Sequence, residues 1–104
     1  MFLQPGEAWA FEAEDRLTFV HSAEGRLDVD LSLTALEAVL GPSYLRVHRS
    51  WLVALSAVRG IARDDGEMSL LVGGGTLTVP VARERAAQVK ARLLARTIGL
   101  RSNE

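Results

Sequence analysis

The stretch YLRVHRSWLV, residues 44–53, sets three polar residues between two short apolar runs. Apolar and polar side chains alternate before the polar residues, and three large apolar side chains follow them. Alternation with a period of two is typical of a half-buried strand, so the pattern predicts two strands that meet at a polar junction. The junction consists of His48, Arg49 and Ser50. Arg presents a planar fork of donors and His can donate or accept, so the junction suits an acidic or hydrogen-bond-rich partner.

The part of the chain with an excess of positive charge begins at this same stretch. Residues 1–43 carry two Arg against eight carboxylates, a balance of -6, whereas residues 44–104 carry ten Lys or Arg against five carboxylates, a balance of +5. Eleven of the twelve cations are Arg, the side chain best matched to bidentate phosphate and guanine contacts. A net charge of -1 is low for a nucleic-acid binder, but a segregated basic half favours one. The plainer interpretation is that such a charged face only keeps the surface solvated.

Size and composition predict one cytoplasmic domain with a modest core. The chain has 104 residues, of which 48% are hydrophobic and 24% charged, which argues against disorder. The absence of Cys excludes disulfides, thiolate zinc sites and a cysteine nucleophile. No apolar run approaches the roughly 20 residues that span a bilayer, and no signal peptide is visible.

The segments on either side of the junction predict further strands. Residues 9–14 and 26–31 alternate between apolar and polar side chains, and between them Thr18, Phe19 and Val20 favour a strand over residues 17–22. Short polar turns separate the three segments, so we expect an antiparallel meander. Residues 68–72 and 76–79 predict two later strands, and Asp65-Gly66 is a hairpin signal ahead of them. The three glycines at residues 73–75 lack the Lys-Ser or Lys-Thr of a phosphate-binding loop and indicate a plain turn.

Two helices are predicted. Leucines recur near the helical period at residues 33–40, Thr34 and Glu37 have the spacing of a capping box, and Gly and Pro follow at residues 41 and 42. Pro80 is expected to end the last strand, after which residues 83–96 have the pattern of an amphipathic helix. The internal helix is expected to bury its leucines on the sheet.

In this order, the segments resemble the LytTR DNA-binding domain of bacterial response regulators. The resemblance rests on RVHRSWLV, on VPVAR at residues 79–83 ahead of a helix, and on FEAEDRLTFVHS and LTALEAVLG earlier in the chain. It implies a mostly β fold of antiparallel strands in small packed sheets, with one short internal helix and a C-terminal helix. Family members usually have another strand before residue 9. We therefore expect residues 1–104 to be a single domain excised from a longer regulator with an N-terminal sensing or receiver segment.

The resemblance also implies a function and a site. The family reads double-stranded DNA with loops inserted into successive major grooves, and two copies are expected on tandem or inverted half-sites of promoter repeats. The expected contacts fall on Asp15 and Arg16 in one turn, on His48 and Arg49, and on Arg83. Three further residues are expected to position the DNA backbone: Ser50, Arg46 and Arg85. The chain has Ala54 and Ala82 where the family commonly has Asn and Ser.

Other functions find less support in the residues. The runner-up is a protein–protein interaction module of the same fold without DNA binding, which the net negative charge and Ala54 favour. Two His without a metal-binding spacing, and no GxSxG elbow, argue against an enzyme. Carboxylates cluster at Glu12, Glu14 and Asp15, but a solvated strand end explains them better than a cation site. We expect no metal, no cofactor, no small-molecule substrate and no membrane partner.

Overall fold

The computed structural model describes residues 5–74 and 76–101, and the side chains of residues 6–74 and 76–96. Its larger sheet has five strands, and every neighbouring pair is antiparallel. In sheet order the strands are β3 (Gly25–Val29), β2 (Leu17–Ser22), β1 (Ala10–Glu14), β5 (Trp51–Ala54) and β4 (Tyr44–His48). The predicted meander is therefore correct, and β5 enters the sheet between β1 and β4.

The smaller sheet has three antiparallel strands in sequence order. They are β6 (Val58–Asp64), β7 (Glu67–Val72) and β8 (Leu77–Val81). One prediction needs correction here. The last strand does not end at Pro80, which lies inside β8 and pairs with Ser69. Because β8 is an edge strand, the missing N–H of Pro80 removes no bond from the ladder.

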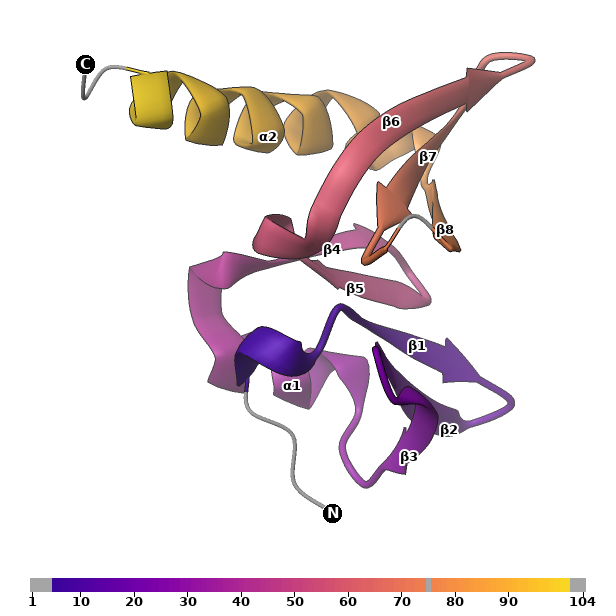
Figure 1. The fold of residues 1–104 in the computed structure, drawn as a ribbon. Helices are drawn as coiled ribbons and strands as arrows, with labels where there is room; N and C mark the ends of the chain where they lie inside the picture. The colour runs from indigo at the N-terminus through magenta and orange to yellow at the C-terminus, as the bar shows by residue number, and fades with distance from the viewer. Residues whose placement is uncertain (1–4, 75, 102–104) are drawn as a thin grey trace.

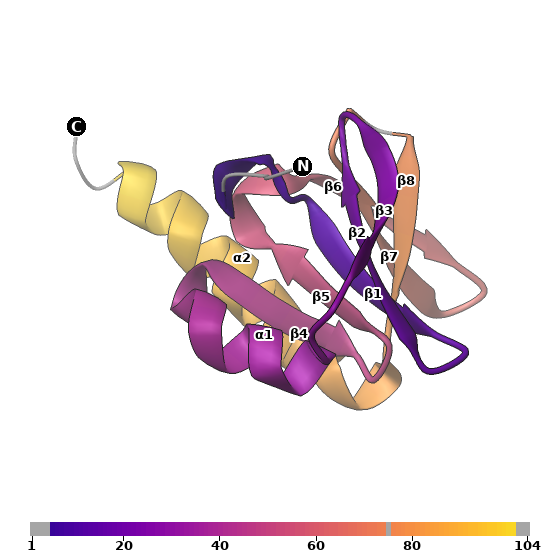
Figure 2. The ribbon, with the colours of Figure 1, turned by 90° about the horizontal axis from the view of Figure 1, so that it is seen from below.

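The helices cover the larger sheet on opposite sides. Helix α1 (Leu33–Leu40) contacts β1, β4 and β5, and α2 (Ala86–Arg101) contacts β4. Figure 1 shows α1 below β4 and β5, with α2 and the smaller sheet above them, and Figure 2 shows α1 in front of β4 and α2 behind it. Both faces of this part of the sheet are thus buried, which is why β5 is buried along its whole length.

The core lies where the two sheets and two helices meet. Its largest fully buried side chains come from β4, β5, β7, β8 and α2: Val47, Leu52, Val53, Leu70, Val72, Val79 and Val89. Short 3-10 segments connect the elements at Pro5–Glu7, Gly41–Ser43, Leu55–Ala57 and Arg83–Arg85. This single core holds the turns at the ends of the strands in fixed relative positions.

The predicted helix ends are partly wrong. The N-cap of α1 is Ser32, whose side chain accepts from the Ala35 backbone N–H at 3.1 Å, so Thr34 and Glu37 do not form a capping box there. Leu33 and Leu36 are buried, as expected. The C-terminal helix begins with a 3-10 turn at Arg83–Arg85 and becomes α-helical at Ala86. A side-chain cap at Ala82 is absent, as its methyl group requires.

Candidate nucleic-acid interface

Three segments that are distant in sequence lie beside one another at one edge of the molecule. They are the β1–β2 turn (Asp15 and Arg16), the β4–β5 turn (residues 48–50) and the segment between β8 and α2 (residues 82–85). The Ala13 N–H donates to the Ser50 carbonyl at 2.9 Å, and the Ala82 N–H donates to the Val47 carbonyl at 2.9 Å. Figures 1 and 2 both show these turns at the same side of the fold. We call this side the turn edge.

The β1–β2 turn projects two exposed side chains. Asp15 and Arg16 both have positive φ, 53° and 69°, as in the two-residue turns that match the twist of a hairpin. Gly or Asn usually occupies such positions, because a Cβ makes the left-handed region costly. The corresponding turn between β6 and β7 has Asp65 and Gly66, the favoured pair. An Arg at the second position of the β1–β2 turn therefore carries a conformational cost that folding does not explain.

Arg46 holds the β4–β5 turn from inside. Its Nε donates to the His48 carbonyl at 3.0 Å, and its Nη2 donates to the Arg49 carbonyl at 2.6 Å. Its Nη1 forms an ion pair with Glu37 of α1 at 3.0 Å. The side chain is only 18% exposed. The guanidinium thus satisfies the carbonyls of the turn and ties the turn to α1.

The neighbouring His48 has a defined orientation. Its Nδ1 accepts from the Ser50 backbone N–H at 3.1 Å, so a neutral ring carries its hydrogen on Nε2. Arg49 is exposed, and among the described residues its side chain has no hydrogen bond or ion pair. The turn therefore offers one ring N–H donor and one uncommitted guanidinium.

The third segment places Arg83 and Arg85 differently. Arg83 is 80% exposed and its Nη2 lies 3.4 Å from a carboxylate oxygen of Glu67, which is also exposed. Exposed ion pairs of this kind are worth about 0–1 kcal/mol, so the guanidinium can change partners at little cost. Arg85 is half-buried, and its Nη1 donates to the Arg46 carbonyl at 3.3 Å. Arg85 therefore binds the third segment to β4, as the Ala82 N–H does.

The eight predicted site residues all lie on or directly behind the turn edge, but they divide into two groups. Arg16, Arg49, Arg83, His48 and Asp15 extend to the surface or offer a free donor or acceptor, and Ser50 lies between them. Arg46 and Arg85 instead donate hydrogen bonds to backbone carbonyl groups of β4 and of the β4–β5 turn. Sequence reasoning missed Glu37, the partner of Arg46, and Glu67, the partner of Arg83. The sequence pattern assigned Glu37 to a capping box and gave Glu67 no role, because both ion pairs join separate segments of the chain.

The acidic cluster near the first turn is engaged in ion pairs. Glu12 lies 2.9 Å from His21 Nε2 and 3.7 Å from Arg26, and Glu14 also pairs with Arg26. Within the described residues, no group of three His, Asp or Glu side chains is placed to hold a metal ion. The same part of the chain contains no helix long and apolar enough to cross a membrane.

Comparison with known proteins identifies the family and the fold. The model of the LytTr DNA-binding domain family matches residues 1–94, so the chain belongs to the LytTR family of DNA-binding domains. A solved LytTr DNA-binding domain, of a putative methyl-accepting/DNA response regulator from Bacillus cereus, is similar with a TM-score of 0.79 and 26% identity. The match covers 88% of this chain and 84% of that one. The expected fold class and family are confirmed.

Two curated relatives are transcriptional regulators. The chain is 36% identical over 84 residues to the CO-responsive transcriptional regulator RcoM of Rhodospirillum rubrum. The matched residues make up 79% of this chain and 36% of the relative. It is also 36% identical over 85 residues to the heme-containing CO-sensing transcriptional regulator RcoM 1 of Paraburkholderia xenovorans, covering 80% of this chain and 32% of that protein. The chain thus spans about a third of the length of these relatives.

Proposed function

We propose that this domain binds double-stranded DNA sequence-specifically, as the output domain of a bacterial transcription regulator, with its turns entering successive major grooves. The observation that supports this most is the turn edge, where three segments bearing exposed Arg side chains are joined by backbone hydrogen bonds. The molecule measures 39 × 34 × 25 Å, and one turn of DNA rises about 34–36 Å. A molecule of this size is long enough to reach two neighbouring grooves.

The contacts divide according to which donors are free. Arg49 is the central contact, because its guanidinium is uncommitted and its turn is held by Arg46. Arg16 and Arg83 contact the DNA on either side of it, as guanine readers or phosphate clamps. His48 donates from Nε2 to a base edge or a phosphate, and Ser50 contacts the sugar-phosphate backbone of the DNA. Arg46 and Arg85 hold the turns in place from behind, so their effect on DNA is indirect.

The cellular setting follows from the same role. We place the domain in the cytoplasm, on promoter repeats, with two copies on neighbouring half-sites. A single domain of net charge -1 gains affinity from a second copy, because the second binding event is then effectively intramolecular. The signal that controls the regulator lies outside this domain. Response to CO belongs to the named relatives, and a receiver segment remains a prediction from the resemblance.

An interaction module that binds protein and not DNA is the alternative function. The acidic groups at the turn edge favour it, because Asp15 and Glu67 repel phosphate. A salt titration distinguishes the two functions. DNA binding to a random duplex pool weakens steeply with added salt because each neutralised phosphate releases counterions, whereas the interaction module binds no DNA at any salt concentration.

The decisive variant reverses two charges at the turn edge. Arg49→Glu with Arg83→Glu should abolish binding to a duplex with one selected site, while the unfolding transition stays close to that of the original chain. The matched control is Arg59→Glu with Arg96→Glu, which makes the same change in net charge at exposed positions away from the turn edge. If the two double variants lose affinity equally, only overall charge matters and the assignment of the site is wrong.

A further inference from the structure

Two pairs of exposed apolar side chains lie at opposite ends of the molecule. Leu17 and Leu31 are 54% and 47% exposed, and Ile61 and Leu94 are 45% and 59% exposed. The first pair lies where β2 begins and β3 leads to α1, at the bottom of Figure 1. The second pair lies between β6 and α2, at the top. Exposed apolar pairs of this kind are typical of interaction surfaces.

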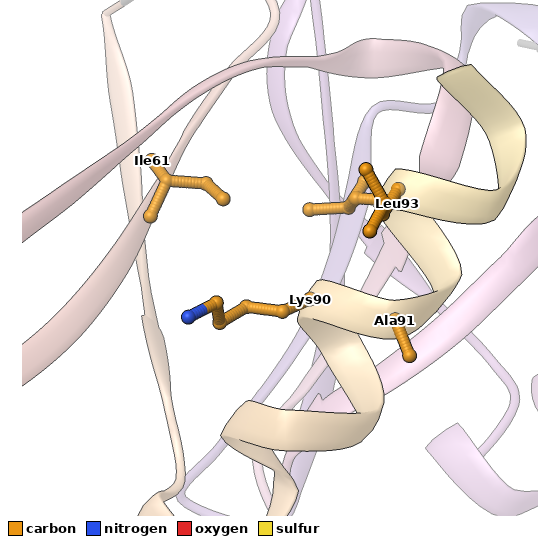
Figure 3. A pocket seen from close by; sticks show the side chains of 5 residues that line it. Ile61, Lys90, Ala91 and Leu93 are labelled. Atoms are coloured by element: carbon orange, nitrogen blue, oxygen red, sulfur yellow. The ribbon is translucent and has the colours of Figure 1, made fainter. Parts of the chain in front are cut away.

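The upper pair lines a cationic groove. A hollow of about 380 Å³ separates β6 from α2 and is lined by Ile61, Lys90, Ala91, Leu93 and Leu94. Figure 3 shows Ile61 facing Leu93 across this gap, with Lys90 reaching towards the side of Ile61. The hollow continues past Arg59 and Arg96, and no carboxylate of the described side chains lines either part. We call this hollow and its continuation the β6–α2 groove.

The lower pair lies in an acidic part of the molecule. Leu17 and Leu31 line a shallow hollow of about 270 Å³ together with Asp30, and Arg16 borders it on the side of the turn edge. Asp28 is exposed in the adjoining strand. The surrounding segment, residues 1–43, has a charge of -6, whereas residues 44–104 have a charge of +5. We call this surface the Leu17–Leu31 patch.

We propose that the β6–α2 groove of one copy takes up the Leu17–Leu31 patch of a second copy, so that copies associate head to tail. Each surface has two exposed apolar side chains. The groove carries Lys90, Arg59 and Arg96, whereas the patch carries the exposed Asp30 beside Asp28, with Arg16 at its border, so the charges are largely opposite. The alternative two-fold arrangement would place groove against groove and bring Lys90 and Arg96 of both copies together, which like-charge repulsion disfavours. The turn edge lies at the right of Figure 1, so the β4–β5 turn and the segment before α2 stay free for DNA when copies stack, whereas Arg16 lies at the border of the contact.

In this head-to-tail arrangement all copies have the same orientation, and this determines how the half-sites on the DNA must be oriented. A head-to-tail contact repeats by translation and rotation in one sense, so copies face the same way along the duplex. Half-sites in the same orientation therefore suit it, and inverted half-sites do not. Each surface is small, so we expect weak association in solution that becomes effective only when DNA holds two copies close together. This deepens the proposed function and, for its DNA part, rests on it.

Disulfide trapping tests the contact without DNA. The chain has no Cys, so a bridge can form only between introduced residues. Leu31→Cys and Leu94→Cys proteins, mixed and mildly oxidised, should give more mixed dimer than random collision allows, and added salt should reduce this excess. Val39→Cys mixed with Leu94→Cys is the control, because Val39 is exposed and apolar but lies outside both surfaces. Equal yields from both mixtures would overturn the proposal, leaving the groove for another partner.

A charge exchange tests the same contact on DNA. On a duplex with two selected sites in the same orientation, Asp30→Lys or Lys90→Glu alone should lower cooperativity several-fold without changing affinity for one site. Both changes in one chain should restore cooperativity, because the opposite charges then meet again. Cooperativity that persists in both single variants would overturn the proposal. Loss of all DNA binding by the original chain would instead contradict the proposed function, and the disulfide result would still decide the contact.

Discussion

At the residue scale, Arg46 has a structural role that its position in a basic motif conceals. The motif predicts that Arg46 contacts DNA. In the structure, however, the three guanidinium nitrogens of Arg46 bind Glu37 and the carbonyls of His48 and Arg49. A guanidinium can satisfy three acceptors in one plane, and a Lys ammonium in the same place cannot reproduce that geometry. The position of Arg49 therefore depends on Arg46.

Replacing Arg46 should affect both stability and DNA binding. We expect Arg46→Ala to lower the free energy of unfolding by about 1–3 kcal/mol, because the carbonyls of the turn lose a charged donor. DNA affinity should fall further than stability explains, and Arg46→Lys should recover only part of either. Urea unfolding and gel shift on one selected site measure the two effects. Full DNA affinity in a folded Arg46→Ala protein would contradict the positioning role.

Arg16 allows the conformational cost of a proposed DNA-contact residue to be measured. It has a φ of 69°, where Gly66 of the β6–β7 turn has 80°. Arg16→Gly should raise the free energy of unfolding by about 0.5–1 kcal/mol, since the left-handed conformation suits Gly, and should weaken DNA binding. Gly66→Arg is the matched reverse change and should destabilise by a similar amount. Both are measured by denaturant titration, and a loss of stability in Arg16→Gly would contradict the expectation.

At the scale of the elements, Tyr44 fastens β4 to the segment before β1. Its hydroxyl donates to the Ala8 carbonyl at 2.7 Å, and its ring lies 5.9 Å from that of Phe11. Burial raises the pKa of the Tyr44 hydroxyl above its ordinary value of 10.0. The neutral hydroxyl is thus favoured by the folded chain, which links stability to pH.

The sign of this linkage gives a prediction. The unfolded chain releases the Tyr44 proton near pH 10.0, before the folded chain does, so the free energy of unfolding should fall as pH rises from there towards the folded pKa. Below that range this contribution is fully present. Tyr44→Phe should remove this pH dependence and cost about 0.5–1.5 kcal/mol for the lost hydrogen bond. Tyr44 is the single Tyr, so tyrosinate absorbance follows it directly.

At the scale of the whole molecule, charge is segregated along the axis that joins the two exposed apolar surfaces. The chain has nearly balanced charge in total, yet its N-terminal 43 residues and the remainder differ by eleven charges. The turn edge lies between these two regions and carries both signs. We therefore expect affinity for DNA to depend on a few well-placed Arg side chains rather than on a broad basic face.

Salt dependence should reveal what each Arg contacts. If Arg49 clamps a phosphate, Arg49→Ala should reduce the slope of log affinity against log salt by about 1 and weaken all sequences alike. If it reads guanine, the slope should change little, and discrimination at one base position should fall by about 1–3 kcal/mol. The same comparison applies to Arg16 and Arg83. An unchanged slope with unchanged discrimination would remove a residue from the interface.

Much of the fold could be predicted because its signals are local. The strands on either side of residues 48–50, the Asp65-Gly66 hairpin and the leucines of α1 each follow from periodicity or turn chemistry within a few residues. The position of Pro80 could not be predicted, because its tolerance depends on β8 being an edge strand. The cap of α1 was misplaced by two residues, since Ser32 and Thr34 are both acceptable N-cap types.

The sequence by itself determined the family, the meander of the first three strands and the turns that carry Arg side chains. Only the tertiary structure decided which of those side chains are free, and which surfaces lie at opposite ends of the molecule. The physical reason is that a guanidinium is committed by acceptors near it in space. For Arg46 these include a carboxylate of α1, and Arg85 reaches a carbonyl of a strand 39 residues earlier in the chain.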